Sequence, residues 1–271
     1  MNPGRSEVSP ASRRGTWIVR RAIVLICLAV SIGSTATRAE DGAFDHAAWT
    51  KLLAAHVDEA GRVAYRNLEQ QDRAAFDAYL AQLAAARPDA WPRAEQIAFW
   101  INAYNAGMVS AVLQGRTPEP PISRVKLFKF WKFAVAGRER TLDEVEHEIL
   151  RQKFAEPRIH FALVCAATSC PPLRREAYRG ADLEAQLDDQ ARRFVGDASR
   201  NRLDHAAKVL RISKIFDWFR DDFAKPAGSV QRFLSRYVPD EATRAWLVTD
   251  PPVTFHDYDW TLNAQPGQRP Q

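Results

Sequence analysis

Apolar residues recur at helical spacing along most of the chain. This periodicity predicts helices, because side chains three and four positions apart share one helix face. The stretch that Pro92 opens is apolar around most of its circumference, which favours a central position in the fold. Two of the predicted helices begin at Asp45 and Pro92, and a third begins after a cap at Asp182. The others cover residues 74–86, 141–153, 215–223, 230–237 and 241–247.

Alternation of apolar and polar residues predicts fewer strands than helices. Residues 158–165 form the clearest of these, and residues 128–135 fit either a strand or an aromatic-rich turn. The other predicted strands follow a turn at Gly61 or cover residues 209–212 and 253–260. We therefore expect an α+β fold, a single helix-rich domain with a small, mostly antiparallel sheet. A cysteine-peptidase-like arrangement is one interpretation of it.

The N-terminal segment has the layout of a signal peptide. Two arginine pairs precede an apolar run over residues 22–32, and small residues lead to Ala36 and Ala39, after either of which we expect cleavage. The run is about half the roughly 20 residues that a membrane-spanning helix needs. We predict a signal peptide over residues 1–39, one domain over residues 40–271 and a periplasmic or extracellular location. An uncleaved anchor is the alternative.

Charge and motifs exclude several classes of function. The net charge is +5, but six arginines and only Glu7 among acidic residues lie in the predicted signal segment, so the remainder is close to neutral. Its bases alternate with acids, unlike the basic face of a nucleic-acid binder. Nucleotide fingerprints are absent from the sequence, and its His and Cys spacings match no common zinc pattern. We expect no nucleic acid, metal, cofactor or membrane-spanning segment in the mature chain.

Two carboxamides, Asn102 and Asn105, lie three residues apart on the apolar helix. Buried amides need hydrogen-bond partners, so one interpretation is that they bind the backbone of neighbouring loops. The other is that one of them orients a catalytic histidine or binds an oxyanion.

Histidines supply the candidate bases. His147 lies four residues before Arg151 and next to Glu146, a group that either points inward or forms a solvated face. Alternation in the predicted strand places His160 on the face opposite Cys165.

Cys170 is the candidate nucleophile, since it follows Ser169 in a turn beyond a strand end. Cys165 and Cys170 are the two cysteines of the predicted mature chain. In an oxidising compartment they can form a disulfide, and two inert thiols are the third alternative.

Four ordered motifs together resemble the DUF547 family, a domain of unknown function. The resemblance spans about residues 96–263 and rests on AFWINAYN at 98–105, TLDEVEHEILR at 141–151, RIHFALVC at 158–165 with SCP at 169–171, and YDWTLN at 258–263. It implies no reaction. Some members of the family look as though they have serine in place of Cys170, which leaves Ser169 or a non-catalytic role open.

Two functions follow as hypotheses. The favoured one is a non-catalytic envelope or ligand-binding protein, whose polar cluster is either structural or binds a peptide or another small polar ligand. The candidate ligand-binding residues are Asn105, Glu146, Arg151 and Ser169. The alternative is a cysteine-dependent hydrolase or acyl-transfer enzyme with Cys170 as nucleophile, His147 or His160 as base and Asn102 or Asn105 as orienting residue.

Overall fold

A computed structural model describes residues 43–270 of the chain. The predicted signal peptide lies outside these residues, and the division into signal peptide and one domain stays a prediction. Within residues 43–270 no helix combines the length and the apolar character needed to cross a membrane.

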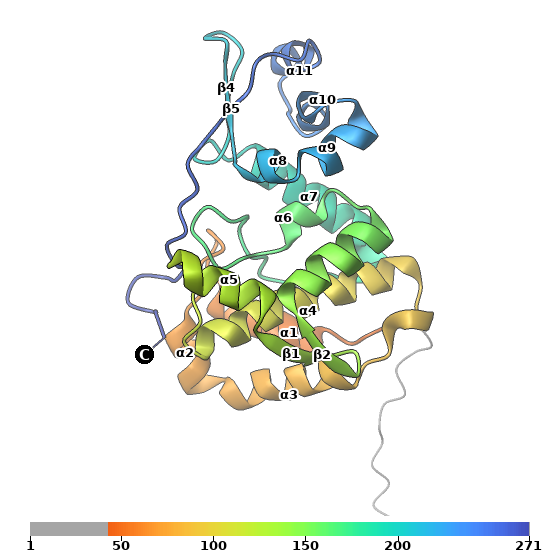
Figure 1. The fold of residues 1–271 in the computed structure, drawn as a ribbon, viewed down its shortest axis with the longest axis vertical. Coiled ribbons are helices and arrows are strands. Elements are labelled where there is room, and N and C mark those ends of the chain that lie inside the picture. Colours follow the sequence, from red (N-terminus) through yellow and green to blue (C-terminus); the bar gives the residue numbers. More distant parts are fainter. Residues whose placement is uncertain (1–42, 271) are drawn as a thin grey trace, which may run out of the picture. The chain divides into compact units, whose positions relative to one another are not determined.

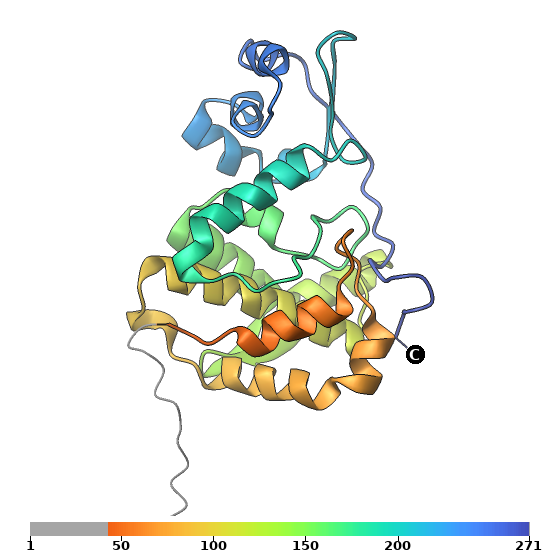
Figure 2. The same cartoon turned by 180° about the vertical axis from the view of Figure 1, so that it is seen from behind.

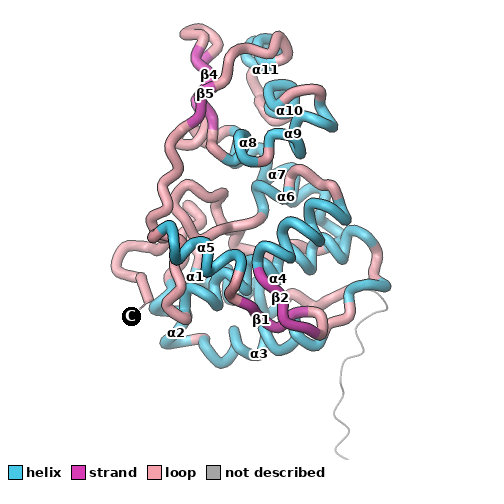
Figure 3. Tube along the Cα trace, viewed as in Figure 1, coloured by secondary structure: helices cyan, strands magenta, loops and turns pink. Residues whose placement is uncertain are grey.

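Helices form most of the regular structure, as the periodicity predicts (Figures 1 and 3). The α-helices are α1 (Ala47–His56), α2 (Tyr65–Gln71), α3 (Arg73–Ala85), α4 (Arg93–Leu113), α5 (Pro121–Lys129), α6 (Ile159–Ala162), α7 (Leu183–Val195), α8 (Ile215–Trp218), α9 (Arg220–Ala227), α10 (Val230–Ser235) and α11 (Glu241–Leu247). Short 3₁₀ turns and one π-helix complete the set as η1 (Pro88–Ala90), η2 (Glu144–Phe154) and η3 (Gly180–Asp182).

Within residues 43–270 the strands form two small sheets rather than one. They are β1 (Lys132–Val135), β2 (Arg138–Thr141), β3 (Arg202–Asp204), β4 (Val209–Ile212) and β5 (Thr254–Phe255). Strands β1 and β2 pair antiparallel, as do β3 and β4, whereas β5 adds to β4 in parallel. Figure 3 shows the two sheets at separate places among the helices. The α+β class is therefore confirmed.

Helix α4 lies at the centre of the larger hydrophobic core. All its residues from 96 to 113 are buried, and it packs against α2, α3, η2 and η3. A second core is built from α7 to α11 and contains Phe161 of α6. In Figures 1 and 2, α6 and α7 lie between α1 to α4 and the C-terminal helices α8 to α11.

The predicted strand over residues 158–165 is wrong. Residues 159–162 form the helical turn α6, and the chain is extended only from Leu163 onward. A short apolar run fits a buried strand and a buried helix equally well, so alternation alone could not decide between them. Helix α6 begins two residues after Pro157, and its C-terminal end is held by hydrogen bonds from α4.

Other differences concern the C-terminal part and the turn at Gly61. The predicted helix over residues 215–223 is divided into α8 and α9, and the alternating stretch at residues 253–260 contains only the two-residue strand β5. After Gly61, Val63 forms single bridges with Val57 and Ala264 in place of a strand. Edge segments this short depend on their tertiary partners rather than on their own pattern.

Candidate functional site

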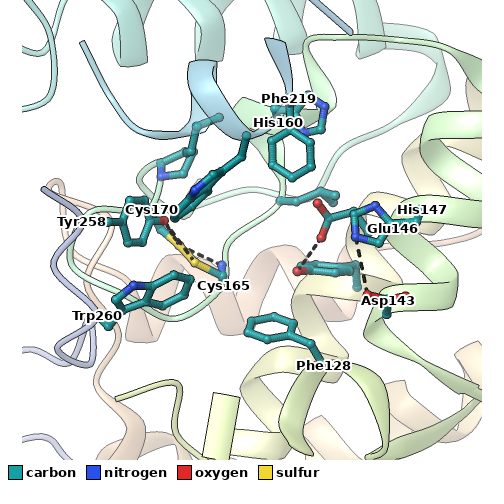
Figure 4. A pocket seen from close by; sticks show the side chains of 15 residues that line it. Phe128, Asp143, Glu146, His147, His160, Cys165, Cys170, Phe219, Tyr258 and Trp260 are labelled. Carbon is teal, nitrogen blue, oxygen red and sulfur yellow. Dashed lines mark hydrogen bonds and ion pairs between the residues drawn. A yellow bond between two sulfur atoms is a disulfide. The ribbon is translucent and has the colours of Figure 1, made fainter. Parts of the chain in front are cut away.

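One cavity collects much of the chemistry predicted from the sequence (Figure 4). Its volume is about 250 Å³. It lies between η2 and α6 on one side and the segments around Cys170 and Tyr258 on the other. The lining residues are Tyr104, Phe128, Asp143, Glu146, His147, His160, Leu163, Cys165, Cys170, Pro171, Ile215, Trp218, Phe219, Tyr258 and Trp260.

A capping box precedes the helix that lines one side of the cavity. Thr141 Oγ1 accepts a hydrogen bond from the Glu144 backbone N–H at 3.1 Å, and the Glu144 carboxylate accepts one from the Thr141 N–H at 2.6 Å. This arrangement satisfies two backbone donors that a helix start would leave unpaired. The π-helix η2 that follows presents Glu146 and His147 to the cavity. Helical segments of this rare kind occur often at functional sites.

Glu146 reaches the cavity beside a buried tyrosine. Its Oε2 accepts a hydrogen bond from the Tyr104 hydroxyl at 3.0 Å. Burial and the neighbouring Glu146 carboxylate raise the pKa of Tyr104 well above its usual value, so the hydroxyl keeps its proton and donates. Figure 4 shows the Glu146 carboxylate opposite Tyr258, between Phe219 and Phe128.

His147 is held by a fixed pair of contacts. The Arg151 guanidinium lies 2.8 Å from His147 Nδ1, and Asp143 Oδ1 lies 3.5 Å from Nε2. Since a guanidinium only donates, Nδ1 must accept, and the proton of the neutral ring sits on Nε2. The lone pair of His147 is therefore already occupied by Arg151.

His160 is oriented differently, by a carboxylate. Its Nε2 lies 2.8 Å from Asp222 Oδ2, and Phe219 stacks on the ring with 3.9 Å between centroids. Arg151 binds both oxygens of the same carboxylate, at 2.6 and 3.1 Å. An ionised carboxylate only accepts, so Nε2 carries the proton and Nδ1 holds the free lone pair.

Burial and hydrogen bonds keep His160 as a neutral imidazole and Asp222 as a carboxylate. Burial lowers the pKa of His160, against the opposing effect of the Asp222 hydrogen bond. Burial alone would raise the pKa of Asp222, but the hydrogen bonds from His160 and Arg151 outweigh it and hold that pKa well below its usual value. His160 is therefore a neutral base near pH 7.

Asn105 positions the segment that joins His160 to the cysteines. Its Nδ2 donates to the Ala162 carbonyl and its Oδ1 accepts from the Val164 N–H, both at 2.9 Å. Asn102 binds the Tyr178 backbone in the same two-sided way, at 2.7 and 3.0 Å. The interpretation of both carboxamides as partners of loop backbone is confirmed.

The opposite wall carries the two sulfur atoms. Cys165 and Cys170 lie within disulfide-bonding distance (Figure 4). The Tyr258 hydroxyl lies 3.2 Å from each sulfur, and burial raises the pKa of this tyrosine above its usual value. These contacts favour the paired alternative over two separate thiols.

An aromatic group adjoins the sulfurs. Trp218, Tyr258 and Trp260 contact one another with centroid separations of 4.6 to 5.7 Å. The Arg124 guanidinium carbon lies 3.7 Å from the centre of the Trp260 ring. Trp218 is 45% exposed, so its ring is accessible from the cavity. We call these three residues the aromatic wall.

The cavity unites some predicted site residues and separates others. Cys170, His160, His147 and Glu146 all line it. The prediction that His160 and Cys165 point apart is wrong, because the helical turn α6 replaces strand alternation and both residues line the same cavity.

The remaining predicted residues lie behind or beside the cavity. Asn102, Asn105 and Arg151 act through the backbone or through other side chains. Ser169 exchanges hydrogen bonds with the Asp259 backbone and fastens the turn to the C-terminal segment. None of these four is among the lining residues of the described cavity.

Sequence reasoning missed Asp222 and the aromatic wall. Asp222 lies 62 positions from His160 and resembles an ordinary surface acid within a charged helix. A buried histidine requires a partner, but its position in the chain cannot be predicted from spacing. Tyr258 and Trp260 belong to a motif that supports the family resemblance, although no role could be assigned to them.

Comparison with known proteins gives one match. Residues 88–195 match the family model described as "Protein of unknown function, DUF547". This match supports the DUF547 family. The matched segment contains α4, η2, α6 and both cysteines, whereas Asp222 and the aromatic wall lie beyond it. No curated protein and no solved structure matches the chain, so the cysteine-peptidase-like interpretation stays a prediction.

Proposed function

We propose that this DUF547-type chain is an exported, non-catalytic protein that binds a small ligand in the cavity between η2 and the aromatic wall. The observation that carries the proposal is the combination of rings with a few convergent polar groups in one recess, which is typical of ligand sites. A volume of about 250 Å³ favours a ligand at or below the lower end of the usual range of roughly 300–1,000 Å³.

The state of the cysteines supports binding over thiol chemistry. A sulfur atom that is bonded to a second sulfur is not a nucleophilic thiolate. Cys170 is also only 2% exposed. Export, which the N-terminal segment predicts, would keep the pair oxidised.

A matched pair of phenylalanines tests the binding site. Phe128 lines the cavity, whereas Phe130 on the same helix end is 71% exposed and does not. A compound that binds the wild type should raise its melting temperature, with about 2.7 kcal/mol of stabilisation at a hundredfold excess over Kd. The shift should vanish in Phe128→Ala and persist in Phe130→Ala. Persistence in both variants would contradict the proposed site.

A second candidate function is a cysteine-dependent hydrolase, and one observation favours it. Cys170 shares the cavity with His160, whose neutral ring is oriented by Asp222. His160 suits the role of base better than His147, because Arg151 occupies the lone pair of His147. His160 and Cys170 lie on opposite sides of the cavity (Figure 4), so this function requires reduction of the cysteine pair and a closer approach of the imidazole to the sulfur. His160 Nδ1 would then take the Cys170 proton, the thiolate would attack an acyl carbon, and the leaving group would depart with the proton from His160. Water would hydrolyse the resulting thioester.

Thiol counting separates the two candidates. The purified chain is alkylated with iodoacetamide before and after reduction, and the labelled cysteines are mapped by mass. Two cysteines that are protected until reduction support the binding proposal. A Cys170 that is alkylated rapidly without reductant, and slowly in His160→Gln or Asp222→Asn, would support the hydrolase instead.

A further inference from the structure

The ligand class can be inferred from the charge balance of the cavity. Ion pairs near the cavity use Asp143 and Asp222, which bind Lys129, His147, Arg151 and His160. Within residues 43–270 no cation lies within ion-pairing distance of Glu146, whose hydrogen-bond partner is the neutral Tyr104 hydroxyl. Arg151 is close enough for Glu146 to raise its pKa, but the hydrogen bonds of this guanidinium go to Asp222 and His147. Glu146 thus brings a negative charge into the cavity without an ion pair of its own among the described residues.

The rings around Glu146 suit a cation as well. Phe128, Phe219 and the aromatic wall line the same recess, and Figure 4 shows Glu146 facing into it. Aromatic faces attract ammonium groups within about 6 Å of the ring centre, and the attraction increases when water is excluded. Arg124 lies over Trp260 and occupies that ring face, so the exposed Trp218 is the ring of the aromatic wall that a ligand can reach.

We propose that the cavity binds an organic ammonium ion, an inference that rests on the proposed binding function. The charge of the ammonium group faces Glu146, and its carbon substituents contact the rings of the aromatic wall, Phe128 and Phe219. A neutral molecule of the same shape would leave the negative charge of the carboxylate without a counter-charge in a partly buried site, which is costly. An anion would face Glu146 and Asp143 with like charge.

Two isosteric probes test the charge requirement. Choline and 3,3-dimethylbutan-1-ol differ only in the positive nitrogen that replaces a carbon, and tryptophan fluorescence or calorimetry gives both affinities. We expect choline to bind at least about tenfold more tightly. Ethanolamine, which carries a primary ammonium group, tells whether the site prefers methylated or unmethylated ammonium. Tighter binding of either ammonium ion than of the neutral alcohol supports the proposal. If neither ammonium ion binds more tightly than the neutral alcohol, the proposal is overturned.

A matched pair of glutamate variants tests the role of Glu146 in binding. Glu146→Gln keeps an acceptor for the Tyr104 hydroxyl but removes the charge, and should weaken choline binding about tenfold. Glu148→Gln removes an exposed charge from the same helix and should leave the affinity unchanged. Trp218→Ala, at a ring that is 45% exposed, should weaken binding with little effect on folding. Unchanged choline affinity in both Glu146→Gln and Trp218→Ala would refute the assignment.

Glucose and acetate, as neutral and anionic probes, separate the failure of this inference from that of the binding function. If glucose or acetate stabilises the wild type but not Phe128→Ala, and neither choline nor ethanolamine stabilises the wild type, the cavity binds ligands but not cations. If no probe of any charge binds, both proposals fail.

Discussion

The larger hydrophobic core surrounds helix α4, whereas the smaller core is packed largely from phenylalanine rings. In the larger core, Asn102 and Asn105 extend hydrogen bonds to loop backbone. In the smaller core, five phenylalanine rings contact one another, with centroid separations of 4.9 to 6.1 Å among Phe161, Phe194, Phe216, Phe223 and Phe233.

The two kinds of core meet at His160. Phe161, the next residue, belongs to the smaller core, while Asn105 from the larger core binds the backbone of Ala162 and Val164. Buried rings contribute in both cores, because each of them removes a large apolar area from water. The directional hydrogen bonds determine where the loop runs. The comparison teaches that α6 is fixed from both sides, by the packing of Phe161 in the smaller core and by the hydrogen bonds of Asn105 from the larger core.

The largest expected effect comes from removing a ring of the smaller core. Phe161→Ala should lower the free energy of unfolding by about 3 to 5 kcal/mol, because the cavity left by a fully buried phenylalanine is filled only in part. Urea unfolding followed by circular dichroism measures this loss. Phe130→Ala, at an exposed position, should change stability by less than about 0.5 kcal/mol. A loss below about 1 kcal/mol in Phe161→Ala would mean that the smaller core is loosely packed.

Substitution of the two carboxamides tests what the hydrogen bonds from the larger core contribute. Asn105→Ala leaves the Ala162 carbonyl and the Val164 N–H without their partner, and should cost about 2 to 4 kcal/mol. Asn102→Ala should cost a similar amount for the Tyr178 backbone. Only Asn105→Ala should also weaken ligand binding, since its loop carries Leu163 and Cys165 into the cavity. Equal effects of both variants on binding would contradict this division of roles.

Acid should weaken the fold through one buried histidine near each core. Burial lowers the pKa of His46 to about 3, against an opposing effect of Asp45, and burial also lowers the pKa of His160. Both stay neutral in the folded protein, while the unfolded chain binds protons below about pH 6.5. The stability that comes from keeping these two histidines neutral is complete above about pH 6.5 and is lost as the pH falls. For His46 the loss is about 2 kcal/mol between pH 7 and 5.

Unfolding in urea at pH 7, 6 and 5 measures this dependence. His46→Gln and His160→Gln should each make stability less dependent on pH, whatever they do to its absolute value. If both variants keep the wild-type slope, other groups cause the acid sensitivity.

The smallest expected effect is that of reducing the cysteine pair. A link between Cys165 and Cys170 closes a loop of only six residues, so its loss should cost about 1 to 2 kcal/mol. Thermal unfolding with and without reductant measures the difference. The Cys165→Ala, Cys170→Ala double variant should show no further change on reduction. A reductant effect that persists in this variant would have another origin.

Prediction from sequence succeeded where local signals were strong. The helix over residues 241–247 has the predicted bounds, and the helix that Pro92 opens is the buried α4. Thr141 caps η2 through a reciprocal pair of hydrogen bonds with Glu144. In each of these segments, cap residues and apolar spacing agree with the final environment, so tertiary contacts did not override them.

Prediction failed where a short segment depends on its neighbours. Residues 158–165 alternate as a strand would, yet four of them form α6. Asn105 binds the backbone on both sides of the turn, and Phe161 enters a core whose other rings come from residues 194–233. Such contacts lie too far apart in the chain for periodicity to register them.

The sequence by itself determined the helix-rich α+β class, the buried helix α4 and the list of candidate chemical groups, because spacing and caps act over a few residues. Only the tertiary structure decided which of those groups meet. It placed Cys170, His160, His147 and Glu146 in one cavity, assigned Asp222 to His160 and closed the recess with the aromatic wall. The physical reason is that contacts such as His160–Asp222 and Cys165–Tyr258 join residues 62 and 93 positions apart, whose encounter depends on core packing and not on local pattern.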